Sequence, residues 1–238
     1  MNDRTSRAHG IRRVHRIAVA AGAVVIALVM VTTVASPSTC GNLPARYPPI
    51  VAFELARSGH DLEAVFGDRR HRFARCRHNM IAKMDTLNHA DFALFIPAYG
   101  AFLIASLVGL GRRGRRFTGA GIGFVALAMA GDVAENICLL GLTPALDPTS
   151  IWLAILPWVS GVKWLALGGV GALVAAGLWR TAERHRLSIG LCLLTPAAAI
   201  VGLADPHRFG PLLVTGIAAS WAILFIDGLV QARTRLDA

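Results

Sequence analysis

Two carboxylates and a carboxamide lie in the middle of a long apolar run, where a membrane-spanning helix normally has none. Asp132, Glu135 and Asn136 interrupt the apolar residues 117–142. Their spacing of three and four positions places all three on one face of a helix. A carboxylate inside a bilayer costs at least ~2.5 kcal/mol, so it normally has a partner and a function. A carboxyl group in apolar surroundings beside a second one is a candidate general acid or proton-binding group.

A counter-charge for these carboxylates is present in the next apolar run. At a rise of ~1.5 Å per residue, Lys163 lies ~18 Å along the run that begins at Ile151, and Asp132 lies ~15 Å from the end of its own run at Leu142. The only lysine within an apolar run and the acidic pair therefore occupy the same slab of the membrane. Tyr99, in an earlier run, reaches a similar depth and can donate a hydrogen bond. The predicted catalytic set is Asp132, Glu135, Lys163, Asn136 and Tyr99.

The same residues have a purely structural interpretation. Lys163 and one carboxylate could form an ion pair that clips two helices together, and a buried pair is weak grounds for anything beyond pairing. Two acids against one base argue against this interpretation, because the second carboxylate is left protonated or available for another role. Both interpretations stay open at this stage.

A second group of side chains could bind a substrate near this set. Asp85 and His89 are four residues apart in a predicted helix, where they could cover the mouth of a cavity above the acidic pair. The alternative is a solvated helix face at the level of the lipid headgroups. Glu54 fits either a binding role or the polar side of an interfacial helix. Trp158 and Trp164 are expected to border Lys163 in their common run. The predicted substrate-binding set is Asp85, His89, Trp158, Trp164 and Glu54.

No cofactor or metal is predicted for the chain. Asp85, His89, Asp132 and Glu135 are side chains of the types that bind Zn²⁺, but their spacing matches no metal motif. The four cysteines form no CxxC pair. Signatures of known membrane enzymes and phosphate-binding loops, such as HExxH, GxSxG and GxxxxGK[ST], are also missing from the sequence.

Composition identifies the elements that must hold these side chains. Of 238 residues, 55% are hydrophobic and only 16% are charged, and the mean hydropathy is +0.55. Several separate runs of about 20 apolar residues predict membrane-spanning helices. The runs do not alternate as barrel strands do. We therefore predict an all-α polytopic membrane protein with about six spans, at 17–36, 92–110, 117–142, 151–179, 187–204 and 211–230.

The remaining segments divide the chain around these spans. Residues 1–16 form a basic N-terminus, 37–91 a helical loop, 92–230 a five-helix bundle and 231–238 a polar tail. Within the loop, Pro48-Pro49 predicts a helix over 50–56 that stops at Gly59, and Asp61 opens a second turn that Gly67 ends. A third helix starts near Arg69 and runs into the second span. A cleaved signal peptide is the alternative for the first span.

Basic residues predict the orientation of the spans. Four arginines lie in the short loop 111–116, and others flank the N-terminus and the loop 180–186, so both termini are expected in the cytoplasm. The preference for arginine over lysine is typical of a GC-rich bacterial genome, which indicates the bacterial cytoplasmic membrane. We therefore attribute the net charge of +10 to basic residues that bind lipid phosphates and set the topology, and not to nucleic-acid binding. Cys40 and Cys76 fall outside the cytoplasm, where a disulfide can persist.

Three segments carry a resemblance to a group of proteins. They are Phe-Glu-Leu-Ala-Arg-Ser at 53–58, Asp91 with Tyr99, and Asp-Val-Ala-Glu-Asn at 132–136, followed by Lys163 in the next span. In these features the chain resembles a family of small bacterial polytopic membrane proteins without an assigned activity. The resemblance covers roughly residues 48–180. It implies that the polar site matters and implies no particular chemistry.

Two functions fit the sequence. The first is a membrane-embedded enzyme that uses acid/base chemistry on a lipid or isoprenoid-like small molecule within the bilayer. The second is a proton- or cation-linked transporter subunit, in which the carboxylates bind and release the ion and a homo-oligomer supplies further helices. A structural assembly protein remains if the ion pair is only structural. An open cavity at the polar site would favour one of the first two, whereas the absence of a cavity would leave only the structural interpretation.

Overall fold

The computed structural model describes residues 2–35, 39–44, 47–68, 74–110, 115–179 and 186–233. Every regular element in these ranges is helical, and six helices are long and apolar enough to cross a membrane. The protein is therefore an all-α polytopic membrane protein, as predicted. The elements are α1 Asn2–Ala35, α2 Pro49–Glu54, α3 Gly59–Phe66, α4 Ala74–Ala90, η2 Asp91–Phe95, α5 Ile96–Leu110, α6 Arg115–Leu142, α7 Ile151–Trp179, α8 Arg186–Ala204 and α9 Pro206–Arg233.

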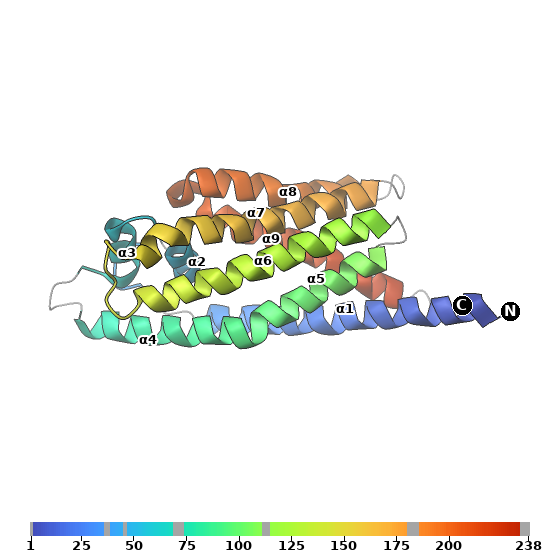
Figure 1. Ribbon diagram of the computed structural model, residues 1–238, viewed down its shortest axis with the longest axis horizontal. Helices are drawn as coiled ribbons and strands as arrows, with labels where there is room; N and C mark the ends of the chain where they lie inside the picture. The colour runs from blue at the N-terminus through green and yellow to red at the C-terminus, as the bar shows by residue number, and fades with distance from the viewer. Residues whose placement is uncertain are drawn as a thin grey trace.

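The spanning helices form a closed ring in chain order. From α5 to α9 each helix packs against the next, and α1 closes the ring by packing against both α5 and α9. Figure 1 shows the helices running lengthwise, with α2, α3 and the start of α4 at one end and the two chain termini at the other. We call the first of these the loop end. A ring of this kind lets each helix turn one face inward and one face to lipid.

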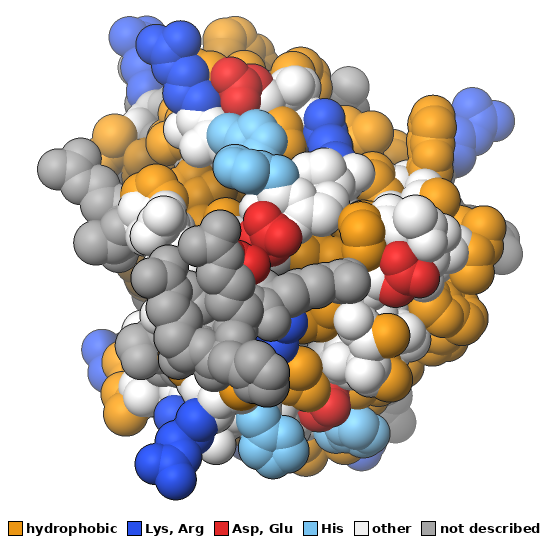
Figure 2. Space-filling view, turned by 90° about the vertical axis from the view of Figure 1, so that its left-hand side faces the viewer, with side chains coloured by type: hydrophobic (Ala, Val, Ile, Leu, Met, Phe, Trp, Pro, Cys, Tyr) orange, Lys and Arg blue, Asp and Glu red, His pale blue; other side chains and the backbone are white. Residues whose placement is uncertain are grey.

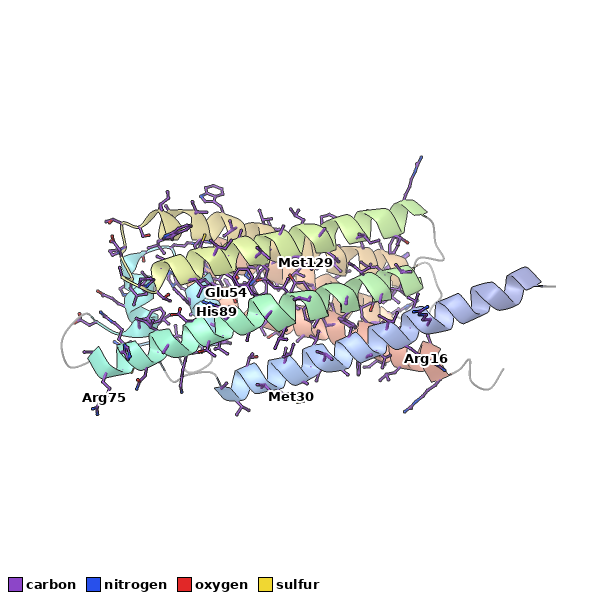
Figure 3. The ribbon with its side chains drawn as sticks, turned by 60° about the horizontal axis from the view of Figure 1, so that its bottom comes forward. Arg16, Met30, Glu54, Arg75, His89 and Met129 are labelled. Atoms are coloured by element: carbon purple, nitrogen blue, oxygen red, sulfur yellow. A yellow bond between two sulfur atoms is a disulfide. The ribbon has the colours of Figure 1, made fainter. Side chains whose placement is uncertain are left out.

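The outward faces carry the large apolar side chains that lipid requires. Trp158, Leu165 and Ile200 are each more than half exposed. The inward faces hold buried polar side chains, among them Asn88, Ser160 and Thr195. Figure 3 shows Arg16 and Arg75 towards opposite ends of the molecule, away from the apolar middle. This distribution is what a bilayer imposes on a helical bundle.

The second span is a composite helix. α4 continues without a break through the π-helical turn η2 into α5, so the predicted continuation of the loop helix into the span is confirmed. The predicted start of that helix near Arg69 lies outside the described residues. A π turn holds one residue more than an α turn. Asp91 and Tyr99, eight residues apart, therefore take the relation of residues seven apart, which share a helix face.

A compact cap covers the loop end of the ring. We use this name for residues 47–67, which contain α2 and α3. Pro49 occupies the first turn of α2, as expected for a residue without an amide hydrogen. Ser58 caps α3 by accepting from the Asp61 amide, so the prediction that Gly59 stops a helix is wrong: Gly59 begins the next one. Gly67 ends α3 at φ 76°, as predicted.

The cap is fixed to the ring from several sides. Phe53 and Phe66 are fully buried and pack edge to face at 4.8 Å between centroids. The Tyr47 hydroxyl donates to the Pro206 carbonyl at 2.9 Å. Cys40 and Cys76, whose pairing the sequence left open, form a disulfide that joins the segment before the cap to α4. Figure 2 shows this end of the molecule, where acidic, basic and histidine side chains gather among exposed polar ones.

Two spans begin earlier than the sequence predicts. α1 extends back to Asn2, through the basic segment 1–16, and α9 begins at Pro206 and not at 211. A proline fits the first turn of a helix, which explains the earlier start of α9. The basic loops 111–114 and 180–185 and the tail from 234 lie outside the described residues.

Candidate functional site

A single lysine lies at the centre of a group of acidic side chains. The Lys163 ammonium donates to Asp132 at 3.0 Å, to Glu54 at 3.2 Å and to Glu135. The side chains of Lys163, Asp132 and Glu135 are almost fully buried, and that of Glu54 is 13% exposed. We call these four residues the Lys163 cluster. An ammonium group has three hydrogens, so these three acceptors saturate it.

A close approach of two helices brings the cluster together. A Cβ added to Gly131 on α6 would lie 2.9 Å from the Lys163 backbone nitrogen and 3.2 Å from the Val159 carbonyl oxygen on α7. Only glycine allows the two backbones to lie this close. Asp132 and Glu135 follow Gly131 on the same helix and therefore reach Lys163. The sequence prediction of an α6–α7 pairing at this depth is confirmed by these contacts.

Glu54 enters the cluster from the cap. The Ser160 hydroxyl donates to the Glu54 carbonyl at 2.8 Å and so holds the end of α2 against α7, one turn before Lys163. Glu54 is therefore not the polar side of an interfacial helix, which was one of its two interpretations. Burial raises the pKa of Glu54 above its ordinary value, and the neighbouring Lys163 opposes this shift. Figure 3 shows Glu54 among the side chains in the interior.

A fourth carboxyl group adjoins the cluster through an amide. The Asn136 side chain donates to the Asp91 carboxylate of η2, and Asn136 lies next to Glu135 in the chain. Sequence reasoning placed Asn136 in the site but did not include Asp91 among the site residues. Asp91 stands at the edge of its apolar run, where an acidic residue has an ordinary interfacial explanation. Only the resemblance pointed to it.

Tyr99 lies close to the same group of charges. Tyr99 is 1% exposed, and Asp132 is one of the charged groups near its hydroxyl. The hydroxyl finds no hydrogen-bond partner of normal geometry in the described part of the chain. Its ring packs on Trp221 of α9 at 5.6 Å and on Phe95 at 5.5 Å. Trp221 therefore fixes the position of Tyr99, a role that the sequence did not indicate.

Three of the predicted substrate-binding residues take other positions. Trp158 is 77% exposed on the outer face of α7, so the prediction that it borders Lys163 is wrong; the Trp164 ring lies 4.9 Å from the ammonium instead. His89 is exposed, and its Nδ1 lies 2.6 Å from the Asp85 backbone oxygen of its own helix. The expected lid of Asp85 and His89 is not formed. The cap covers the cluster instead, through Glu54.

The side chains of the cluster are largely buried. The two best-formed pockets in the described residues are small, about 30 Å³ each, and lie against the cap; neither is lined by Lys163 or its carboxylates. Neither pocket is the open cavity that the sequence placed above the acidic pair. Among the described residues no three His, Cys, Asp or Glu side chains are grouped to hold a metal ion, which removes the alternative metal site of Asp85, His89, Asp132 and Glu135.

Comparisons with known protein families, with curated proteins and with solved structures found no match for the chain. The function is therefore argued from the geometry and charge of the site. What distinguishes the site is its composition: four carboxyl groups and one lysine in the interior of a membrane bundle, beneath a covalently tethered cap.

Proposed function

We propose that the Lys163 cluster binds and releases protons, and that the protein uses this to drive the proton- or cation-linked movement of a small solute across a bacterial cytoplasmic membrane. Both termini face the cytoplasm, so the cap faces outward. The observation that carries the proposal is the excess of buried carboxyl groups over the single lysine. Asp91 and its partner Asn136 belong to the same system.

The charge of the site supports proton binding. If Glu54, Asp91, Asp132 and Glu135 were all ionised, one lysine would leave three negative charges uncompensated in the interior of the bundle. Each buried ion costs several kcal/mol, and nearby like charges add to this. Carboxyl groups in such surroundings hold protons at neutral pH. A site that exchanges these protons with water on one side and then on the other is a proton carrier.

The closed state of the cluster is consistent with one stage of such a cycle. A carrier must occlude its ion between openings, and lids that close over sites are common conformational devices. Here the cap contributes a carboxylate to the site, so moving the cap changes the charge around Lys163. Protonation of Glu54 would weaken its attraction to Lys163 and would favour release of α2 from α7. Cap movement and proton binding are thereby coupled.

Reconstituted vesicles test this function. Purified protein is placed in lipid vesicles that contain a pH-sensitive dye, and a Na⁺ or K⁺ gradient is imposed across them. We expect proton movement that exceeds that of empty vesicles and that Glu135→Gln and Asp132→Asn abolish. Asp227→Asn, an acidic residue near the end of α9, is the control and retains the flux. Wild-type flux equal to that of empty vesicles contradicts a transport function.

A second function is favoured by one specific observation. The Tyr99 hydroxyl is buried near Asp132 without a normal hydrogen bond, and Asn136 adjoins Glu135. A hydroxyl, a carboxyl and an amide together could position and protonate a lipid or isoprenoid-like substrate once the cap opens. Lipid profiles of cells that express wild type, Asp132→Asn or Tyr99→Phe test it. A lipid species that accumulates only in the variants supports the enzyme and counts against the carrier.

A further inference from the structure

Buried polar atoms continue from the Lys163 cluster towards the loop end. Asn88 on α4 is 1% exposed, and neither its amide nitrogen nor its oxygen has a hydrogen-bond partner in the described residues. One oxygen of Asp85 is buried in the same unpartnered condition, and so is the second oxygen of Glu135. A buried amide without partners costs ~1–3 kcal/mol, so each such group needs an explanation. Packing alone gives none for Asn88.

These atoms lie in a row along one helix. Asp85, Asn88 and Asp91 follow one another at three-residue steps, ~4.5 Å apart along the axis. Asp91 accepts from Asn136, which leads to Glu135 and the cluster. The side chain of Asn88 has no direct hydrogen bond to Asp85 or to Asp91, so a bridging water is needed at each of these steps. Asp85 is only partly buried and therefore connects the row to the surface at the loop end.

The π turn η2 lies at the point where the row meets the cluster. Its additional residue brings Asp91 onto the face of the helix that carries Tyr99, and Asp91 there accepts from Asn136 of α6. In a regular α-helix residues eight apart differ by about 80° around the axis, so the π turn aligns Asp91 and Tyr99 more closely. π turns are found most often at functional sites, which fits a role in this connection.

We propose that Asp85, Asn88, Asp91 and Asn136 form a water-lined proton path between the loop end and the Lys163 cluster. Its ligands are water and hydronium, which the carboxylate and amide groups bind by donating and accepting hydrogen bonds. The path rests on the proposed proton-binding function and adds to it the route by which protons arrive. Protons pass along it by hydrogen-bond exchange between the polar side chains and single waters, with no bond to carbon formed or broken.

Hydrogen–deuterium exchange of the buried carboxyl groups tests the path. Purified protein in an ester-free detergent at neutral pH is mixed with D₂O, and the infrared band of protonated carboxyl groups is followed in time. At this pH exposed carboxyls are ionised, so the band reports buried ones. We expect fast exchange in the wild type and exchange slowed by about ten- to a hundredfold in Asn88→Leu, from the loss of one buried hydrogen-bonding step.

Two further variants complete the experiment. Thr86→Leu changes an exposed residue of the same helix and is expected to exchange at the wild-type rate. Asp85→Leu changes the partly exposed residue at the outer end of the path and is also expected to slow exchange. It replaces Asn88→Leu as the test variant if Asn88→Leu does not fold. If all proteins show the band and folded Asn88→Leu or Asp85→Leu exchanges at the wild-type rate, the proton path is refuted. The proposed proton-binding site is not refuted by that result. Equal slowing in Thr86→Leu also overturns it. No band at neutral pH overturns both proposals.

Discussion

Replacement of Lys163 by methionine isolates the contribution of the central charge. Methionine has a similar length and no charge, so Lys163→Met leaves the packing of α7 largely intact. It removes all three hydrogen bonds that hold Glu54, Asp132 and Glu135 together. Breaking a buried ion pair by removing one partner costs ~3–5 kcal/mol. For a chain of this length the melting temperature should fall by about 6–20 °C.

The loss should also depend on pH. Without the ammonium, the carboxyl groups left behind must hold more protons in the folded protein than in the unfolded one. A fold that binds extra protons loses stability as the pH rises. The difference in melting temperature between wild type and Lys163→Met is therefore expected to grow between about pH 5 and pH 8. The corresponding difference in the free energy of unfolding grows by at most ~1.4 kcal/mol per pH unit for each group.

The chain supplies its own control for this measurement. Lys83, the only other lysine, is exposed on α4, so Lys83→Met should change the melting temperature by no more than a surface substitution does. Tryptophan fluorescence during heating, in detergent, measures all three proteins. A second variant, Lys163→Met with Glu135→Gln, should recover part of the loss because it removes a stranded acid. Equal melting temperatures for Lys163→Met and Lys83→Met would refute the cluster.

Three further predictions concern the elements around the cluster. Because burial raises the pKa of Glu54, the wild type should lose stability as the pH rises from about 4.3 through that raised pKa. Glu54→Gln should therefore flatten the dependence of melting temperature on pH. A profile in Glu54→Gln that equals the wild-type profile would count against a raised pKa at Glu54. Gly131→Ala should destabilise by ~1–3 kcal/mol because its Cβ meets α7, whereas Gly161→Ala, in open space, should not; equal effects contradict the close approach. Loss of the Cys40–Cys76 disulfide by Cys40→Ser should cost ~2–4 kcal/mol in thermal unfolding, and no change would show that the tether does not hold the cap.

The central pair could be predicted from the sequence because charged residues inside apolar runs are rare. Asp132, Glu135 and Lys163 were identified by type and depth alone, and their contacts agree. Glu54 was harder, because a glutamate in a loop helix has an ordinary interfacial explanation and lies 109 residues from its partner. Neither periodicity nor depth indicates that a loop helix folds back onto the bundle.

Rotation around a helix accounts for the other differences. Depth along α7 predicted that Trp158 lies near Lys163, but five residues carry it to the opposite side, where it is 77% exposed. The π turn η2 likewise shifts every following residue of α5 by one position, which brings Asp91 and Tyr99 onto one face. No residue type in 91–95 announces such a turn, so Asp91 could not be assigned by spacing.

The most direct test of the proposed proton-binding site is whether its buried carboxyl groups carry protons at neutral pH. Infrared spectra at pH 7 of wild type, Glu54→Gln, Asp132→Asn, Glu135→Gln and the control Asp227→Asn give the answer. The account predicts a protonated carboxyl band in the wild type that changes in at least one of the three cluster variants and is unchanged in the control. Spectra with only ionised carboxylates, or a band that no cluster substitution alters, would contradict it.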